Sequence, residues 1–133
     1  MSAAFYAPAL ALLLVASSPA LSQDLNPSLV QLIAMPERYD GKLVQVTGYC
    51  NLEFEGNAIY LHRDDERYGN TKNGIWLDTN EKVMRDPKLR KTHCIVRGVF
   101  SAKNHGHMGL FSGGLSNIDR YDAWPPRMPK QKP

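Results

Sequence analysis

The sequence predicts a mainly β protein, and two observations carry that prediction. Apolar and polar residues alternate along residues 43–54, which is the pattern of a long strand with one buried face. Four shorter stretches of strand-type composition follow it, at 58–62, 74–78, 93–101 and 109–118. Five strands of such lengths are enough to build one small sheet or barrel.

A short helix is expected before the first strand. Asn26 is a favourable N-cap, and Pro27 suits the first helical position because its missing N–H would have no partner there. Pro36 is expected to end the helix. The apolar residues that fall on one side at helical spacing are Leu29, Val30, Leu32 and Ile33.

Period-two alternation separates an inward from an outward face in the first three strands. Gly48, inside the first strand, is typical of a bend at a barrel corner. The outward side chains of the second and third strands include Tyr60, His62 and Trp76. The expected inward residues are Val44, Val46, Gly48, Cys50, Leu52 and Phe54 in the first strand, Ile59 and Leu61 in the second, and Ile75 and Leu77 in the third.

The connections between these strands are polar. Residues 55–57 are expected to form a tight turn. Residues 63–73 are too polar to be buried, so they are expected to form a solvated loop. Between the third and fourth strands, residues 79–91 are expected to form a short helical turn capped by Thr79 or Asn80.

The order of these elements is that of an OB-fold, a small, partly open barrel of five strands. The sequence therefore predicts a five-stranded OB-like barrel, with a short N-terminal helix and a short helical turn between strands three and four. A five-stranded sandwich is the alternative. Glycines suited to a tightly curved sheet stand at positions 48, 98, 113 and 114.

Four segments of the chain add a resemblance to this prediction. They are MPERYDGKLVQVTGY, LEFEGNAIYLH, KNGIWLD and GHMGLFSG. Together they resemble segments of a family of small, exported, uncharacterised bacterial proteins of OB-fold type, over residues 29–120. The resemblance implies fold and kinship alone, because that family has no assigned activity from which a catalytic residue could be transferred.

The N-terminal residues 1–22 are expected to be a secretory signal peptide. Their apolar core, from Ala9 to Ala16, is shorter than the ~20 residues of a membrane-spanning helix. Small residues at Ala20 and Ser22 suit cleavage by signal peptidase. An uncleaved anchor is the alternative, because no Lys or Arg precedes the apolar core.

Signal cleavage would leave a periplasmic or secreted protein without a transmembrane anchor. It would consist of one OB-like domain over residues 23–120 and a Pro-rich basic tail over residues 121–133, which is expected to be disordered. The formal net charge is +3, from 16 basic and 13 acidic residues. A neutral domain lacks the broad basic surface that neutralises phosphates, so nucleic acid is not an expected partner. Three of the basic residues, Arg127, Lys130 and Lys132, lie in the segment 124–133, and without them the chain has 13 basic and 13 acidic residues and is formally neutral.

The chain has two cysteines, Cys50 and Cys94, and an even number in an exported protein favours a disulfide. Both share a side with inward residues of their strands. A register that pairs the two cysteines would also pair Val46 with Gly98, and a bridge would close a loop of about 45 residues, worth roughly 3–4 kcal/mol. The alternative is two buried free thiols. A metal role is not expected, because the chain has no CxxC motif.

OB-folds bind ligands across strands two and three, between the loop that joins strands one and two and the loop that joins strands four and five. In this chain those loops are residues 53–57 and 103–108. Tyr60 and Trp76 would form a stacking platform between them for a planar or sugar ligand. Alternatively, both rings pack beneath residues 63–73 or the N-terminal helix. The candidate ligand-binding residues are Tyr60, His62, Trp76, Asp78, Lys103, Asn104, His105 and His107.

The stretch around Gly106 has a second interpretation, as a metal site. Imidazole and thioether ligands suit copper, which an exported protein can meet, so His105, His107 and Met108 are weak alternative ligands. A His-Gly-His turn at a hairpin tip requires no metal, however, and this is the favoured interpretation. No cofactor is expected, and no catalytic residue is assigned because no nucleophile–base spacing is present.

These observations favour an exported, non-enzymatic binding module. Its ligand is an unknown small molecule, a glycan, a peptide or an envelope protein. One alternative is an inhibitor or immunity-type protein that contacts its partner through residues 63–73 and 103–109. The other is a periplasmic copper-binding protein that uses His105, His107 and Met108.

Overall fold

A computed structural model of the chain describes residues 2–5, 25–53 and 55–124. Most of the expected signal peptide, with its cleavage point, and the tail from residue 125 onward lie outside the described residues. Within the described part of the chain, no helix is long and apolar enough to cross a membrane.

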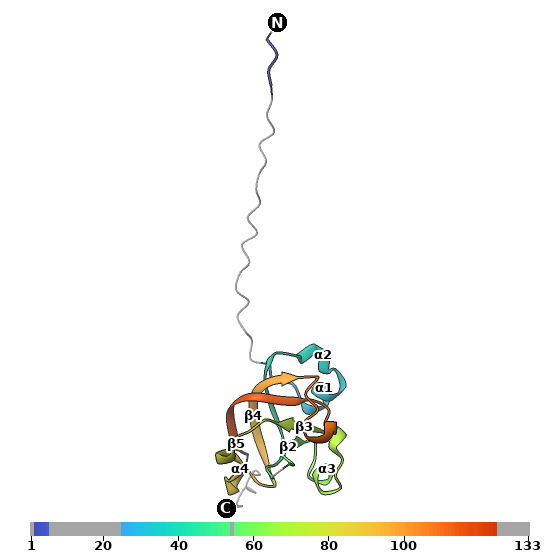
Figure 1. Ribbon diagram of the computed structural model, residues 1–133, viewed down its shortest axis with the longest axis vertical. Helices are drawn as coiled ribbons and strands as arrows, with labels where there is room; N and C mark the ends of the chain where they lie inside the picture. The colour runs from blue at the N-terminus through green and yellow to red at the C-terminus, as the bar shows by residue number, and fades with distance from the viewer. Residues whose placement is uncertain (1, 6–24, 54, 125–133) are drawn as a thin grey trace, which may run out of the picture.

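Five strands form a closed barrel in the order β1-β2-β3-β5-β4, and β4 pairs back onto β1 (Figure 1). All neighbours are antiparallel except β3 and β5, which run parallel. The prediction of a mainly β, OB-like barrel is therefore confirmed. The strands are β1 (Leu43–Asn51), β2 (Ala58–Tyr60), β3 (Gly74–Leu77), β4 (Thr92–Ser101) and β5 (Gly114–Ala123).

Two short helices precede the barrel, α1 (Leu29–Ala34) and α2 (Pro36–Tyr39). The N-cap of α1 is Ser28 rather than Asn26, because Ser28 and Gln31 form a reciprocal capping box. Val30, which was expected on the packed face, is exposed, since it lies about 100° around the helix from Leu29.

Short helical elements also interrupt both long connections. Residues 63–73, expected to be a loop, contain α3 (Arg63–Arg67) and the 3-10 turn η1 (Thr71–Asn73). The Asp65 carboxylate holds this segment together: it accepts hydrogen bonds from the His62 backbone and from the side chains of Asn70 and Asn73. The second connection contains α4 (Glu81–Met84), capped by Asn80 as expected, and the 3-10 turn η2 (Pro87–Leu89).

The last strand is displaced from its expected position at 109–118. It begins at Gly114, after a 3-10 turn η3 (His107–Gly109). Residues 105–112 leave the barrel wall and fold over its outside, where Phe111 is buried in a separate cluster. The barrel also includes residues 121–123, which the sequence had assigned to the tail.

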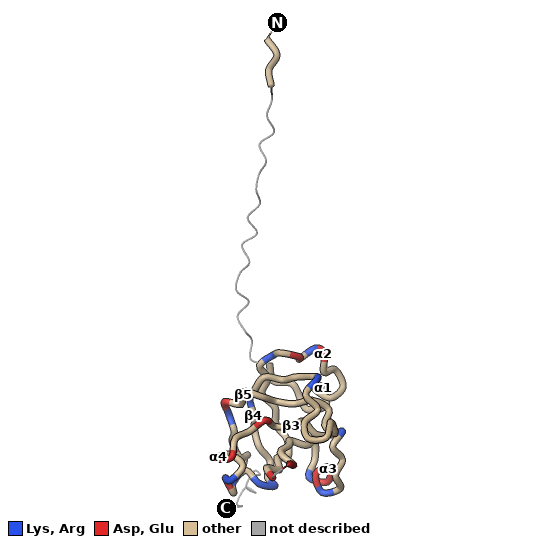
Figure 2. Tube along the Cα trace, viewed as in Figure 1, with Lys and Arg blue, Asp and Glu red and all other residues tan. Residues whose placement is uncertain are grey.

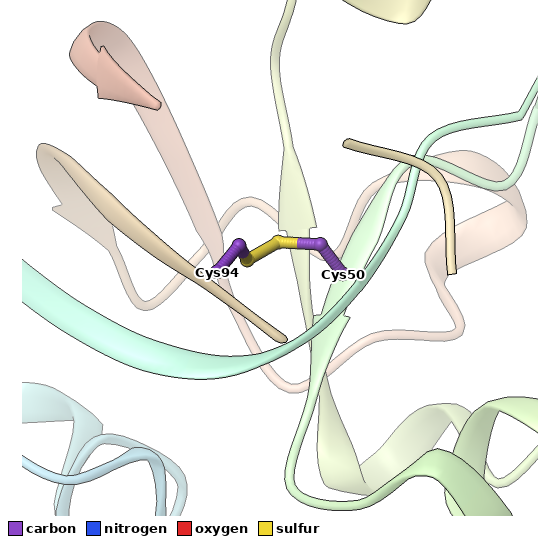
Figure 3. Close-up of a disulfide and its surroundings, with 2 residues drawn as sticks. All are labelled: Cys50 and Cys94. Carbon is purple, nitrogen blue, oxygen red and sulfur yellow. A yellow bond between two sulfur atoms is a disulfide. The ribbon is translucent and has the colours of Figure 1, made fainter. Parts of the chain in front are cut away.

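The barrel interior is filled by alternating apolar side chains, and a disulfide crosses it between Cys50 of β1 and Cys94 of β4 (Figure 3). The expected disulfide is confirmed, with Cα atoms 5.9 Å apart. The expected register is wrong by two residues: Cys94 lies opposite Gly48, and Cys50 lies opposite Thr92. A slip of two residues keeps the same side chains inward, so alternation alone cannot detect it.

Gly48 is required where β1 bends beneath the N-terminal helix. A Cβ atom there would lie 2.5 Å from Cδ1 of Leu29 and 2.6 Å from the carbonyl oxygen of Tyr60. Gly48 is expected from the sequence to mark a bend at a barrel corner, and the structure shows that it permits a close approach of Leu29 and Tyr60 to β1. α1 and α2 cover one end of the barrel, and α3 and α4 lie toward the other end (Figure 1).

Candidate functional site

The face expected to bind ligand, across β2 and β3, is covered by the chain itself. Phe111 packs against Trp76 with ring centroids 5.4 Å apart and against Tyr60 with centroids 6.3 Å apart. Tyr60 is 6% exposed and Phe111 only 3%. The platform of Tyr60 and Trp76 is thus a packed cluster, covered by Phe111 of the β4–β5 connection.

Hydrogen bonds and one glycine hold this cover in place. His105 Nδ1 lies 2.7 Å from the carbonyl oxygen of Phe111, and Ser112 Oγ donates to the carbonyl oxygen of Lys72. Gly106 has φ +61° and lies so close to the Trp76 ring that a Cβ atom would overlap it. Burial, followed by the negative charges of nearby glutamates, raises the pKa of the Tyr60 hydroxyl above its usual value.

The other expected site residues do not converge on one point. His107 Nε2 lies 3.7 Å from a carboxylate oxygen of Glu55, whereas His105 turns toward Phe111. Met108 is 78% exposed, with φ +54°. Among the described residues, no group of three His, Cys, Asp or Glu side chains could hold a metal ion. The remaining candidates, His62, Asp78 and Lys103, are exposed, and Asn104 caps the Gly106 backbone N–H.

A different depression lies at the end of the barrel near α3, between that helix and the start of β4. It has a volume of about 590 Å³. We call it the α3–β4 groove. Its lining residues are Arg63, Glu66 and Arg67 from α3, Tyr49 from β1, Lys91 just before β4, Thr92 and His93 at the start of β4, and Trp124 just after β5.

The groove is basic, with three cations and one carboxylate in its lining. Arg63 and Arg67 are four residues apart on α3, so their side chains emerge on one face. In the part of the chain that the structure describes, Arg63 forms no ion pair or side-chain hydrogen bond. Along α3 the two arginines flank three consecutive acidic residues, Asp64, Asp65 and Glu66, and both charge colours are seen there in Figure 2.

Lys91 and Glu66 form the polar floor of the groove. Lys91 Nζ lies 4.0 Å from Glu66 and 3.8 Å from Glu53, distances that indicate loose ion pairs. The Glu66 side chain is 14% exposed and accepts a hydrogen bond of 2.9 Å from Asn51 Nδ2. Glu66 is therefore held in position by a side chain of β1.

Aromatic rings form the other wall of the groove. Tyr49 and His93 face each other across the β1–β4 pair, with centroids 5.5 Å apart and planes at 77°. Trp124 is 50% exposed, and its backbone N–H donates to the carbonyl oxygen of His93. Trp124 therefore supplies the exposed aromatic surface of the groove, because Tyr49 is only 5% exposed.

Lys91 has φ +49°, a left-handed conformation that favours glycine. An L-residue in this region is strained by about 1–2 kcal/mol. Strained residues concentrate at functional sites, where the side chain is needed in a fixed position. Glu55, Met108 and Asn117 share this left-handed conformation, so it describes the backbone just before β4 and does not by itself assign a role to the Lys91 ammonium group.

None of these groove residues was identified from the sequence. Arg63 and Arg67 are in a segment that the sequence predicts to be a loop. In a loop, a spacing of four residues does not place two side chains on one face. Trp124 stood in the expected tail. One feature of the sequence does indicate that Tyr49 and His93 lie close together. Each directly precedes a cysteine, and a disulfide between the two cysteines brings their neighbours together.

A second, smaller depression of about 440 Å³ lies between the β3–α4 connection and β5. Asp78, which was expected to bind ligand, lines it together with Asn117 and Tyr121. The hydroxyl of Tyr121 is buried, and this burial raises its pKa above the usual value. This depression contains no basic side chain among its lining residues.

Comparison of the chain with protein-family models, with curated proteins and with solved structures finds no match. The kinship with small exported bacterial proteins stays a prediction.

Proposed function

We propose that this chain is an exported, non-enzymatic binding module that holds its ligand in the α3–β4 groove. The single observation that carries the proposal is the lining of this groove. It combines Arg63, which has no ion pair among the described residues, and the cations of Arg67 and Lys91 with the rings of Tyr49 and Trp124. Cations that orient a polar ligand, next to aromatic surface that supplies contact area, are typical of ligand sites.

The disulfide supports the export part of the proposal. Disulfides persist in oxidising compartments such as the periplasm and the extracellular space, and they are rare in the cytosol. The Cys50–Cys94 bridge is buried in the barrel, as in a structural rather than a catalytic disulfide. The periplasm or the secreted fraction is therefore the proposed location.

The β2–β3 face is a less suitable ligand site than the groove, because Phe111 covers its aromatic rings. Ligand binding on that face would have to displace Phe111 from between Tyr60 and Trp76. Burying a phenylalanine side chain is worth about 1.5–3 kcal/mol. Moving Phe111 into water would therefore make the free energy of ligand binding less favourable by about that amount. The α3–β4 groove has no such cover among the described residues.

One observation favours a second candidate, an inhibitor or immunity-type interaction partner. Tyr68 and Met108, from residues 63–73 and 103–109, are each 78% exposed. Exposed aromatic residues and methionine are enriched at protein–protein interfaces. Co-purification of one protein in a stoichiometric complex, lost in Tyr68→Ala or Met108→Ala but kept in Arg63→Gln/Arg67→Gln, would support this candidate over the groove.

The proposal is tested by calorimetric titration of the oxidised protein with three anionic probes: hexuronate oligosaccharides, poly-glutamate and inorganic phosphate. We expect at least one probe to bind and to lose about tenfold or more in affinity in Arg63→Gln/Arg67→Gln. The matched control is Arg38→Gln/Lys42→Gln, which removes two exposed charges near α2, at the other end of the barrel. Binding that is equal in both variants, or absent for every probe, would overturn the proposal.

A further inference from the structure

We infer that the ligand of the α3–β4 groove is an acidic glycan, an oligosaccharide whose sugars carry carboxylate groups. This inference rests on the proposed binding function and names its ligand class. It follows from three features of the groove.

The first feature is the pair of arginines on α3. A guanidinium group binds a carboxylate through two parallel N–H donors, and Arg63 has no competing ion pair among the described residues. Arg63 and Arg67 are one helical turn apart, which is about 5–6 Å between Cβ atoms. That spacing suits carboxylates repeated along one short chain.

The second feature is the exposed indole of Trp124. A sugar ring has an apolar C–H face, and an amphipathic aromatic ring is the side chain that covers such a face while keeping contact with water. Trp124 is half exposed beside the Tyr49–His93 pair, and its backbone is tied to β4 by the hydrogen bond to His93. The indole is thus available at the rim of the basic groove.

The third feature is the carboxylate of Glu66 among the cations. It would repel a ligand that is anionic throughout, such as a polyphosphate. A sugar hydroxyl, in contrast, needs an acceptor, and an ionised carboxylate is the strongest acceptor among side chains. Glu66 is held by Asn51 Nδ2, so one oxygen is oriented by the barrel while the carboxylate still lines the groove.

An extended acidic peptide fits less well. Peptides commonly bind by adding a strand to a free sheet edge. At the groove, Tyr49 already pairs with both Tyr60 and His93, and the carbonyl oxygen of His93 accepts the Trp124 backbone N–H, so these strand ends do not offer a free edge among the described residues. The groove would have to hold a peptide by its side chains alone.

The test uses the oxidised protein and calorimetric titration with a panel of hexuronate oligosaccharides. Uncharged oligosaccharides of equal length and poly-glutamate are the comparison ligands. We expect a hexuronate member to bind, and to lose about tenfold or more in affinity in Arg63→Gln/Arg67→Gln and in Trp124→Ala. Arg38→Gln/Lys42→Gln should keep the affinity within about twofold.

The outcomes separate this inference from the proposed function. Groove-dependent binding of poly-glutamate without binding of any hexuronate would overturn the glycan inference and leave the proposed function standing. Equal binding of uncharged and acidic oligosaccharides would also overturn it, because the arginines would then play no part. No groove-dependent binding of any probe would overturn both.

Glu66→Gln gives a second readout that does not depend on the arginines. It keeps an acceptor oxygen for hydroxyls but removes the negative charge. For a hexuronate oligosaccharide we expect a change of less than about threefold, because the lost charge and the retained acceptor have opposing effects. A gain of more than tenfold would indicate a ligand that is purely anionic and would contradict the assignment to a sugar.

Discussion

Tyr49 and His93 meet edge to face, 5.5 Å apart, at the one register position of β1 and β4 that directly precedes both half-cystines. Inside the barrel the bridge joins Cys50 to Cys94, and on the outside the two rings form the wall of the α3–β4 groove. Adjacent residues of a strand point to opposite faces, so Cys50 and Cys94 point into the barrel while their neighbours Tyr49 and His93 point outward. The disulfide therefore fixes the strands that carry the groove.

Removal of the disulfide tests this relationship. Cys50→Ala/Cys94→Ala should lower the free energy of unfolding by about 2–4 kcal/mol, because the unfolded chain is no longer constrained. We also expect weaker ligand binding in the groove under conditions where the variant is fully folded. Urea denaturation and calorimetric titration measure the two effects. Unchanged affinity in the folded variant would show that the bridge does not organise the Tyr49–His93 wall.

Lys91→Gly should change stability and ligand affinity in different directions, because Lys91 has both a positive φ and a charge in the groove. Glycine relieves the left-handed strain at φ +49° but adds freedom to the unfolded chain. The net change in the free energy of unfolding should lie between zero and about 1 kcal/mol of stabilisation. The affinity for an anionic ligand should fall, because one of three cations is lost. A variant that is both less stable and equally able to bind would contradict the role given to Lys91.

Gly106→Ala should open the cover of the β2–β3 face. An alanine Cβ would overlap the Trp76 ring, whereas at Gly109, which has a similar φ of +68°, nothing lies within 4 Å. Gly109→Ala is thus a control that shares the positive φ without the overlap, while Gly106, with ψ −154°, is in a backbone region that essentially only glycine adopts. We expect Gly106→Ala to be less stable than the control by about 1–3 kcal/mol, with altered Trp76 fluorescence. Equal losses would mean that the contact with Trp76 is unimportant.

Alkaline pH should destabilise the protein through its buried tyrosines. Burial raises the pKa of Tyr60 and Tyr121, so the folded state keeps their protons at a pH where the unfolded state loses them. Their contribution to stability is complete below the ordinary tyrosine pKa of about 10 and is lost as pH rises from there through the higher folded-state pKa. Chemical denaturation from pH 8 to 11 should show a shallower decline in Tyr60→Phe than in wild type. An equally steep decline would contradict this, and Tyr68→Phe is the exposed control.

The sequence predicted the barrel well, because alternation reports which face of a strand is buried. It could not determine the β1–β4 register, since a shift from Cys50 opposite Cys94 to Cys50 opposite Thr92 leaves every inward residue inward. It also misplaced β5, because the apolar Phe111 satisfied the strand pattern while packing outside the barrel.

The groove was beyond prediction for a different reason. Its residues come from a short helix, two strand ends and the residue after the last strand, and only the closed barrel brings Arg63, His93 and Trp124 together. For the aromatic platform, the sequence predicted an exposed binding site that the structure shows to be covered. Tyr60 and Trp76 do share the expected outer face, but side-chain alternation cannot show that Phe111 covers it.

The central claim is that ligand binds in the α3–β4 groove rather than across β2 and β3. The most direct measurement is a backbone amide NMR titration of the isotope-labelled protein with the hexuronate panel. The account predicts shifts centred on residues 63–67, 91–93 and 124. Shifts centred instead on Trp76 and residues 103–108, or no specific shifts with any member of the panel, would contradict it.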